Sequence, residues 1–382
     1  MADRTRVGVV GCGLIAQVMH LPYLTELDDR FELAAVCDVS PAVVEACARR
    51  FGAARTFTRW EDLVEAELDA VLVLTSGSHA PVAVACAQAG MHVFVEKPMC
   101  LSAAEGAEML SAAERAGVRL MVGTMKRYDP AYERLAVLAP QLDDLRLVRV
   151  TTLESPLEPY VAHYPLVRAD DVPSDTLAAL RVDDDARLRD ALPDVDDETR
   201  WVYRWILLDS LVHELNALRG VLGEPTEVRF ADVRRRCVSI NLAFGEVECH
   251  LSWVDLPGIA RYSQELAFYS PDRRVALLLP SPFLRSAPSE LIIEEGDAGT
   301  ARASRTVEVT SYEEAFKREL VEFSECIRSG REPRTSGIDG LHDVALCASI
   351  ARAHATREPV AAPSDVARAA APPPTLVPGT QP

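Results

Sequence analysis

A single lysine, Lys97, stands between Glu96 and Pro98 at the end of an apolar run. The chain has 40 lysine and arginine residues together, and the lysines among them are Lys97, Lys126 and Lys317. Arginine keeps its proton in a protein, whereas a lysine that is desolvated or lies near another positive charge can lose it near neutral pH. Lys97 is therefore a candidate for a group that accepts or relays a proton. The plainer alternative is a fixed cation that binds a cofactor.

Asp209 and His213 are spaced four residues apart in a segment with helical periodicity. Residues at this spacing share one face of a helix, so both side chains can point into one cleft. A carboxylate beside an imidazole fixes the tautomer of the ring and stabilises its charged form. Such a pair can serve proton transfer, although a capping carboxylate and a satisfied helix histidine have the same spacing.

A glycine motif near the N-terminus predicts a dinucleotide site. Gly11, Gly13 and Ala16 form a G-x-G-x-x-A pattern that follows a strand-like run and opens a helical segment. Gly11 permits a tight turn, Gly13 lets the backbone approach a pyrophosphate, and Ala16 allows close helix packing. The helix N-terminus favours negative phosphates, and Leu14 and Ile15 belong to the same cofactor-binding loop. A glycine turn without a ligand is the alternative.

Asp38 ends the next strand-like run, about 20 residues beyond the glycine motif, as dinucleotide folds require. Its carboxylate can accept hydrogen bonds from the 2′- and 3′-hydroxyls of the adenosine ribose, and it repels a 2′-phosphate. The sequence therefore predicts NAD as the cofactor, with NADP less favoured. The alternative is that Asp38 is a plain turn residue.

The order of the expected elements gives the fold class. Short β-branched runs alternate with helical segments at 6–11, 31–38, 69–76, 91–96 and 118–124. Continuous apolar strands separated by helices indicate a parallel sheet covered on both faces. Beyond about residue 145 the strands alternate apolar and polar residues, as in 238–244 and 247–253, which indicates a half-covered, mostly antiparallel open sheet. Helical segments follow at 311–329 and 340–355.

We therefore expect an α/β Rossmann NAD-binding domain at 1–125 and an α+β domain at 126–358 for substrate binding and oligomerisation. The second domain contains a strongly acidic insertion at about 160–200. This insertion is either a solvated surface excursion or a lid over the substrate that uses Tyr160, His163 or Tyr164. The tail at 359–382 is rich in alanine and proline and is expected to be disordered.

Composition excludes several other classes of protein. The formal net charge of −18 argues against nucleic acid as a partner, because phosphate binding needs clustered lysine and arginine. The nine cysteines are scattered, odd in number and free of any C-x-x-C pair, which predicts neither a disulfide framework nor a metal site. No apolar stretch reaches about 18 residues, and no signal peptide is recognisable. We expect a cytoplasmic protein without a membrane segment.

The stretch 75–98 resembles the signature of the Gfo/Idh/MocA family of oxidoreductases. The residues that carry the resemblance are Thr75, His79, Gly90, His92, Glu96, Lys97 and Pro98. Further similar stretches lie at 20–24, 122–132 and 207–225, so the resemblance extends from residue 5 to about residue 358.

The resemblance implies the roles of individual residues. By it, Lys97 contacts both the nicotinamide ribose region and the substrate hydroxyl, and Asp209 with His213 completes the catalytic set. The implied cofactor-binding residues also include Thr75, His79, Glu96 and Lys97. The implied substrate-binding residues are Lys97, Arg127, Tyr128, Asp209 and His213. Tyr160 is a further candidate for substrate binding, on the alternative that the acidic insertion is a lid. An ordinary turn explains Arg127 and Tyr128 nearly as well.

The predicted function is an NAD-dependent oxidoreductase that transfers a hydride between nicotinamide and a secondary alcohol or ketone of a sugar, cyclitol or sugar derivative. Oxidation of an alcohol also releases a proton, for which Lys97 and His213 are the candidate bases. One alternative is an enzyme that keeps NAD bound and uses transient oxidation to acidify a C–H bond for elimination, as a lyase or a glycosidase-like enzyme. Another is a cofactor-binding regulator without turnover.

We also expect a homodimer or a homotetramer that assembles through the C-terminal sheet. The two helical segments near the end of the chain can cover only one face of that sheet. The other face carries Glu248, His250 and Ser252, which predicts a partly polar contact.

Overall fold

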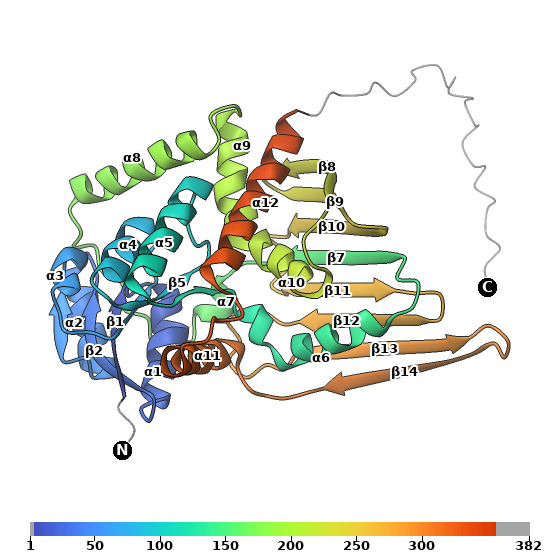
Figure 1. Cartoon of the computed structure of the whole chain (residues 1–382), viewed down its shortest axis with the longest axis horizontal. Helices are drawn as coiled ribbons and strands as arrows, with labels where there is room; N and C mark the ends of the chain where they lie inside the picture. The colour runs from blue at the N-terminus through green and yellow to red at the C-terminus, as the bar shows by residue number, and fades with distance from the viewer. Residues whose placement is uncertain (1–3, 357–382) are drawn as a thin grey trace, which may run out of the picture.

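The computed structural model describes residues 4–356, so the predicted tail at 359–382 lies outside the described residues. Two β-sheets follow one another along the long axis of the molecule, and helices surround the first sheet and line one side of the second (Figure 1). Within residues 4–356, no helix combines the length and the apolar character needed to cross a membrane.

Sheet A is a parallel sheet with the strand order β3-β2-β1-β4-β5-β6. Its strands are β1 (Thr5–Val10), β2 (Phe31–Cys37), β3 (Arg55–Phe57), β4 (Ala70–Val73), β5 (His92–Glu96) and β6 (Leu120–Gly123). Every residue of β4 and β6 is buried, as expected for strands that are covered on both faces. The predicted Rossmann architecture is confirmed.

The helices around sheet A begin where the sequence supplies capping residues. They are the π-helical turn η1 (Ala16–His20), α1 (Leu21–Glu26), α2 (Pro41–Phe51), α3 (Trp60–Val64), α4 (Ala80–Gln88) and α5 (Ala103–Ala116). Ser40 caps α2 by accepting a hydrogen bond from the backbone N–H of Val43. Ser102 and Glu105 form a reciprocal capping box at the start of α5. These caps fix where the loops at the edge of sheet A end.

Sheet B has the strand order β14-β13-β12-β11-β7-β10-β9-β8 and is antiparallel except for the pair β7 and β10. Its strands are β7 (Leu147–Glu154), β8 (Glu227–Arg234), β9 (Cys237–Phe244), β10 (Val247–Asp255), β11 (Ser263–Tyr269), β12 (Arg273–Leu279), β13 (Glu290–Asp297) and β14 (Arg302–Val309). In β9, buried Val238 and Ile240 flank exposed Ser239, as the alternating pattern predicted. The predicted mostly antiparallel open sheet is confirmed.

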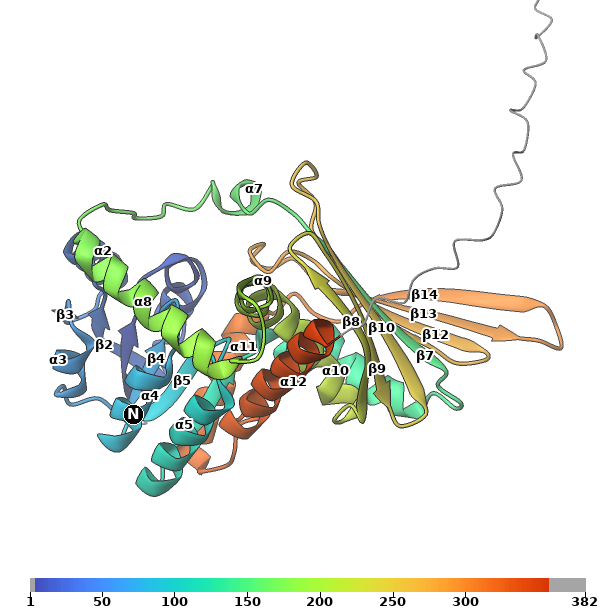
Figure 2. The same cartoon turned by 90° about the horizontal axis from the view of Figure 1, so that it is seen from above.

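Helices lie on one side of sheet B (Figure 2). The remaining elements are η2 (Met125–Tyr128), α6 (Pro130–Leu138), η3 (Ala139–Gln141), α9 (Asp197–Val202), the π-helix η4 (Tyr203–Leu211), α10 (Val212–Leu222), α11 (Ala315–Ser329) and α12 (Gly337–Ala355). Helix α6 contacts β12 and β13, and α12 contacts β8. The helices therefore bury the apolar face of the sheet.

The last two helices also return to the N-terminal domain. Leu320 and Phe323 of α11 are fully buried in the same core cluster as β1 and α1, and the ring of Phe323 meets Phe94 edge-on at 5.7 Å. Helix α12 packs beside α5 and α10. Sheet A ends just before the boundary expected near residue 125. Helices α11 and α12, which lie beyond that boundary in the sequence, nevertheless help to complete the core around sheet A.

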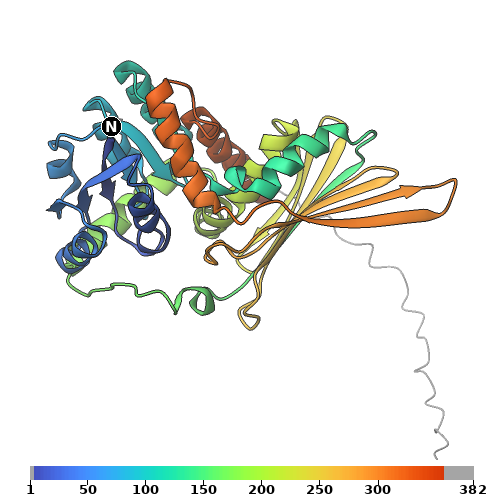
Figure 3. The ribbon, with the colours of Figure 1, turned by 90° about the horizontal axis from the view of Figure 1, so that it is seen from below.

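The acidic insertion lies along the N-terminal domain (Figures 2 and 3). It contains α7 (Glu158–Val161), an irregular stretch at 162–173 that we call the crossing segment, and α8 (Ser174–Ala191). Leu188 is the buried residue of α8, so this helix rests on the protein by a narrow contact. The Arg187 guanidinium binds Glu105 of α5 at 2.6 Å. The insertion therefore lies along the surface of the domain that carries the glycine motif.

Candidate active site

The glycine loop has the backbone that a dinucleotide site requires. Gly11 has a φ of +97°, and a Cβ atom there would lie 2.7–2.8 Å from backbone atoms of Leu74 and Thr75, so only glycine fits. At Gly13 a Cβ would meet nothing within 4 Å, which leaves open space beside the backbone. Leu14 and Ile15 follow in the first helical turn, and Ala16 is buried against the sheet. The loop can therefore receive a pyrophosphate, as predicted.

Asp38 lies directly beside this loop. Its Oδ2 accepts a hydrogen bond from the N–H of Cys12 at 2.8 Å, and its Oδ1 accepts one from the N–H of Ser40 at 2.9 Å. A carboxylate has about four acceptor positions, so both oxygens can still accept from ribose hydroxyls. The position and the remaining acceptor capacity fit the predicted role.

Lys97 follows β5 and reaches the π-helix η4. Its Nζ donates to the carbonyl oxygen of Asp209 at 2.7 Å and to the carboxylate Oδ1 at 3.1 Å. Burial alone would raise the pKa of Asp209, but the charge and hydrogen bond of Lys97 outweigh it and hold the pKa below its ordinary value. The Asp209 side chain is 51% exposed, so solvent reaches its contact with Lys97.

His213 follows η4 on α10, but Asp209 is not its partner. Asp209 is turned to Lys97, and the Nδ1 atom of His213 has no hydrogen-bond partner among the described residues. The expected carboxylate–imidazole pair is therefore not formed, because Lys97 takes the Asp209 carboxylate as its partner. Burial, followed by the positive charges of Lys126 and Lys97, lowers the pKa of His213 well below its ordinary value. The ring is therefore neutral near neutral pH, and the same causes make it a weaker base than a free imidazole.

Lys126 is the site residue to which the sequence analysis gave no role. It lies on η2, where its Nζ donates to Gln264 at 2.6 Å, contacts the Tyr262 hydroxyl at 3.4 Å and lies 3.8 Å from Glu214. Its side chain is 6% exposed, and burial is the main cause that lowers its pKa. The available signal was the same as for Lys97, a lysine kept in a chain that otherwise uses arginine.

Acidic and polar side chains surround this second lysine. Buried Glu214 accepts from the hydroxyl of Thr152 at 2.7 Å and from the side chain of Gln264. Burial raises the pKa of Glu154, which ends β7 nearby. Tyr160 from the insertion accepts from the N–H of Tyr262 at 2.6 Å, so the structure brings this predicted residue to the edge of the lysine cluster.

Arg127 and Tyr128 do not join Lys97. The hydroxyl of Tyr128 is 2.9 Å from Thr335 Oγ1, and the residue is 2% exposed. The Arg127 guanidinium lies 3.7 Å from Asp339 of α12. Because η2 is a 3₁₀ turn with about three residues per turn, adjacent side chains point in different directions. The turn directs Lys126 to the cleft and its two successors into helix packing, which corrects the expectation for this pair.

His79 and Glu96 are buried and hydrogen-bond to the backbone around Lys97. The ring nitrogens of His79 lie 2.8 Å from the carbonyl oxygen of Pro98 and 2.7 Å from that of Thr75, and the residue is 1% exposed. Glu96 is likewise buried, and its Oε2 accepts from the N–H of Lys97 at 3.0 Å. These side chains hold the loops after β4 and β5 together, so their part in the site is to position the backbone.

Glu96 also belongs to a buried group whose side chains could hold a metal ion. His20 Nε2 lies 2.7 Å from Glu96 Oε1, and the candidate ligand atoms of His20, Glu96 and Glu319 lie within 4.8 Å of one another. Burial, followed by the charge of Glu96, raises the pKa of Glu319 well above its ordinary value. A protonated Glu319 removes one negative charge from the group, while neither of its carboxyl oxygens has a hydrogen-bond partner among the described residues.

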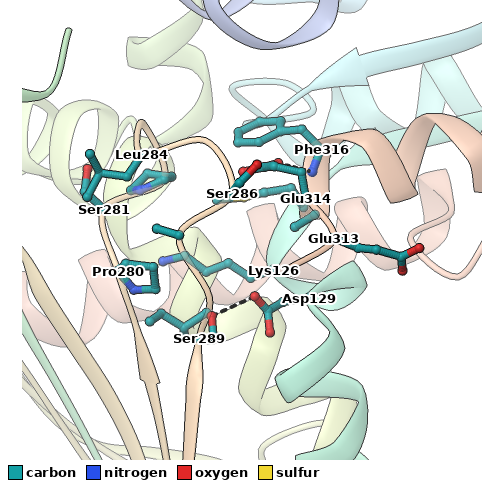
Figure 4. A pocket seen from close by; sticks show the side chains of 15 residues that line it. Lys126, Asp129, Pro280, Ser281, Leu284, Ser286, Ser289, Glu313, Glu314 and Phe316 are labelled. Atoms are coloured by element: carbon teal, nitrogen blue, oxygen red, sulfur yellow. Dashed lines mark hydrogen bonds between the residues drawn. The ribbon is translucent and has the colours of Figure 1, made fainter. Parts of the chain in front are cut away.

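A separate hollow borders Lys126 on the side of η2 (Figure 4). It is lined by η2, the loop after β12 and the start of α11, and the hydroxyl of Ser289 donates to Asp129 there at 2.7 Å. Among its described lining residues, Lys126 is the member shared with the lysine cluster. The hollow is therefore distinct from the place where Lys97 and Asp209 meet.

Comparisons with known proteins agree with this geometry. Residues 5–124 match a family model described as an oxidoreductase family with an NAD-binding Rossmann fold. The inositol 2-dehydrogenase of Paracoccus denitrificans is 30% identical over 290 residues, which cover 73% of this chain and 79% of that protein. The myo-inositol 2-dehydrogenase of Thermotoga maritima is 26% identical over 348 residues, which cover 88% and 92% of the two chains.

Solved structures show the same fold. A 3-ketoreductase from Actinomadura kijaniata in complex with NADP matches with a TM-score of 0.68 at 20% identity, over 90% of this chain and 96% of that chain. A putative NADPH-dependent oxidoreductase from Desulfitobacterium hafniense matches with a TM-score of 0.73 at 17% identity, over 93% and 97% of the two chains. Both share the order of a Rossmann domain followed by an open sheet.

The fold, the glycine loop and the lysine-centred cleft define an oxidoreductase with a dinucleotide-binding domain. The chain belongs to the Gfo/Idh/MocA family and is an NAD(P)-dependent enzyme that acts on CH–OH groups, as the sequence predicted.

We expect the variant Lys126→Met to raise the pKa of His213, because one of the two positive charges that lower it is removed. The pKa should remain below its ordinary value, since burial is the larger cause and persists. Titration of the imidazole signals by NMR measures this change. Lys317→Met, on the surface beside Glu26, is the matched control, and an unchanged or lowered pKa in Lys126→Met would contradict the assignment.

Proposed function

We propose that the protein transfers a hydride between NAD and a secondary alcohol or ketone of a cyclitol, a sugar or a sugar derivative. The observation that carries the proposal is the Lys97 ammonium held against Asp209 at the carboxyl edge of sheet A, with neutral His213 and Lys126 close by. The relatives described above are dehydrogenases and a ketoreductase, which favours net oxidation or reduction over the elimination alternative.

The chain's own residues can bind the reacting hydroxyl and move its proton. Lys97 has three N–H donors, of which Asp209 receives two, so one remains for a substrate oxygen. His213 is neutral and can take a proton in passing, but its lowered pKa means that it must release that proton again to solvent. In this proposal the Lys97 ammonium gives a proton to His213 as it takes up the hydroxyl proton, or Lys97 first loses a proton and accepts the hydroxyl proton as the neutral amine. The alternative, in which Lys97 is a fixed cation, assigns it binding alone.

Lys97→Arg separates these two roles. A proton-transfer role predicts that kcat falls about 10²-fold or more while the Kd for NAD changes little, because arginine retains charge but cannot give up its proton. Steady-state turnover with a panel of polyols and keto-sugars, together with NAD titration, measures both quantities. Lys317→Arg makes the same exchange on the surface and should leave both unchanged. Turnover of Lys97→Arg within a few-fold of the wild type would rule out the proton-transfer role.

We further propose NAD as the preferred cofactor on the basis of Asp38. Its carboxylate accepts from the N–H groups of Cys12 and Ser40, which fixes a negative charge beside the glycine loop. A 2′-phosphate would meet that charge, whereas a ribose diol would hydrogen-bond to it. We expect kcat/KM to favour NAD over NADP by roughly a hundredfold. Equal or better efficiency with NADP would show that Asp38 does not govern the choice.

The open side of sheet B supports the proposal of a homodimer or homotetramer. Side chains on this side form a row across the sheet, in which Ser239, Ser252, Thr151 and Glu265 are register neighbours. A parallel row contains His250, and a small cluster of Ala267, Ala276 and Ile292 adds apolar surface. A flat face of this kind can pack against its own copy through mixed polar and apolar contacts.

Light scattering at micromolar concentration should give at least twice the monomer mass of 41.8 kDa. Ser252→Arg places a charged side chain in the middle of the open face and should shift the mass toward the monomer, because an unpaired charge in an interface is costly. Val137→Arg, at an exposed position of α6 on the helix-covered side of sheet B, is the control. A wild-type protein with the mass of a monomer would contradict assembly through this face.

A further inference from the structure

The crossing segment is fastened to the N-terminal domain by side chains of that domain. Gln17 pairs with the backbone of Val167: its Nε2 donates to the carbonyl at 3.0 Å, and its Oε1 accepts from the N–H at 2.8 Å. Arg50 of α2 donates to the carbonyl of Pro165 at 2.7 Å. These contacts hold residues 162–173 across the first helix and α2, where the segment is visible in Figures 2 and 3.

Asp171, near the end of this segment, binds the N-terminus of α2. Its Oδ2 accepts from the N–H of Ala42 at 2.8 Å, and its Oδ1 accepts from the hydroxyl of Ser40. The N–H of Ser40 donates to Asp38 at 2.9 Å. Ser40 therefore binds two carboxylates from distant parts of the chain, one through its backbone and one through its side chain.

Asp38 lies where the adenosine ribose of NADP is expected to bind, and Asp171 lies where its 2′-phosphate is expected to bind. In Rossmann domains the acidic residue at the end of the second strand accepts the hydroxyls of the adenosine ribose, which is the position of Asp38. A phosphate on the 2′-oxygen would be placed to accept hydrogen bonds from the next donors along the chain, which are the hydroxyl of Ser40 and the N–H of Ala42. Both donors are taken by Asp171.

We propose that Asp171 is a second specificity-determining residue, which rejects NADP because its carboxylate occupies the place of the 2′-phosphate. The proposal deepens the NAD-dependent function proposed above and rests on it. An NADP molecule would have to displace Asp171 and would then lie beside two negative groups rather than one. NAD, which has a hydroxyl at this position, leaves the contacts of Asp171 intact.

The charge balance around α2 agrees with this role. The first turn of α2 contains no acidic residue, so the anionic partners of its N-terminus come from outside the helix: Asp38 binds the N–H of Ser40, and Asp171 of the insertion binds the N–H of Ala42. The hydrogen bonds from Ser40 and Ala42 also hold the pKa of Asp171 below its ordinary value. The carboxylate is therefore charged at neutral pH, as electrostatic rejection of a phosphate requires.

Calorimetric titration of the purified full-length protein with NAD and with NADP tests the proposal without relying on turnover. We expect Asp171→Asn to tighten NADP binding about tenfold and to change the Kd for NAD by less than about threefold, since one repulsive charge is lost. Asp170→Asn removes the same charge from the preceding, exposed residue and is the matched control. Asp171→Glu keeps the charge and should keep NADP binding weak.

The outcomes separate the inference from the function on which it rests. If Asp171→Asn and Asp170→Asn have the same effect on the Kd for NADP, Asp171 has no special part in cofactor choice. If Asp171→Glu binds NADP as tightly as Asp171→Asn, the negative charge is not the cause. Wild-type protein that binds NADP as tightly as NAD would instead contradict the proposed NAD preference. Thermal unfolding of each variant confirms that it is folded.

Discussion

The contact between the Lys97 ammonium and Asp209 is the interaction on which the arrangement of the cleft depends. It joins a loop at the edge of sheet A to the π-helix η4, which continues into α10, and so links the two halves of the site in addition to the packing of α11 and α12 against the N-terminal domain. The carbonyl oxygen of Asp209 can be reached in this way because a π-helix leaves backbone acceptors out of the usual helical pattern. Buried Glu96 and His79 fix the lysine from the other side.

Electrostatics in the cleft follow from placing two lysines near one imidazole. Lys97 and Lys126 both disfavour a charged His213, and burial acts in the same direction. The opposing negative charges are distributed, with Asp209 beside Lys97 and Glu214 beside Lys126. The site thus keeps its cations paired while its imidazole stays neutral, so a hydroxyl would meet a positive lysine and an uncharged ring.

Local signals in the sequence were sufficient for the fold and for part of the site. The glycine loop, Asp38 and Lys97 each sit at the end of a parallel strand, and such ends converge on one edge of the sheet. The partner of Asp209 was beyond reach, because its spacing from His213 carries no information about Lys97, which lies more than a hundred residues earlier in the chain. Which of Lys126, Arg127 and Tyr128 points to the site depends on a short 3₁₀ turn, which the sequence does not reveal. The path of the insertion depends on contacts such as that of Gln17 with Val167, which are more than a hundred residues apart.

The crossing segment also has a consequence for the timing of the catalytic cycle. The crossing segment would cover a dinucleotide that lies along the ends of β1 and β2, and hydrogen bonds to Gln17, Ser40 and Arg50 hold the segment in place. Release of the dinucleotide would require these hydrogen bonds to break together, whereas a small polyol could enter and leave on the side of sheet B. Such an enzyme exchanges its two substrates at different speeds, so a slow off-rate of the spent cofactor, rather than bond breaking at carbon, would set the pace of turnover.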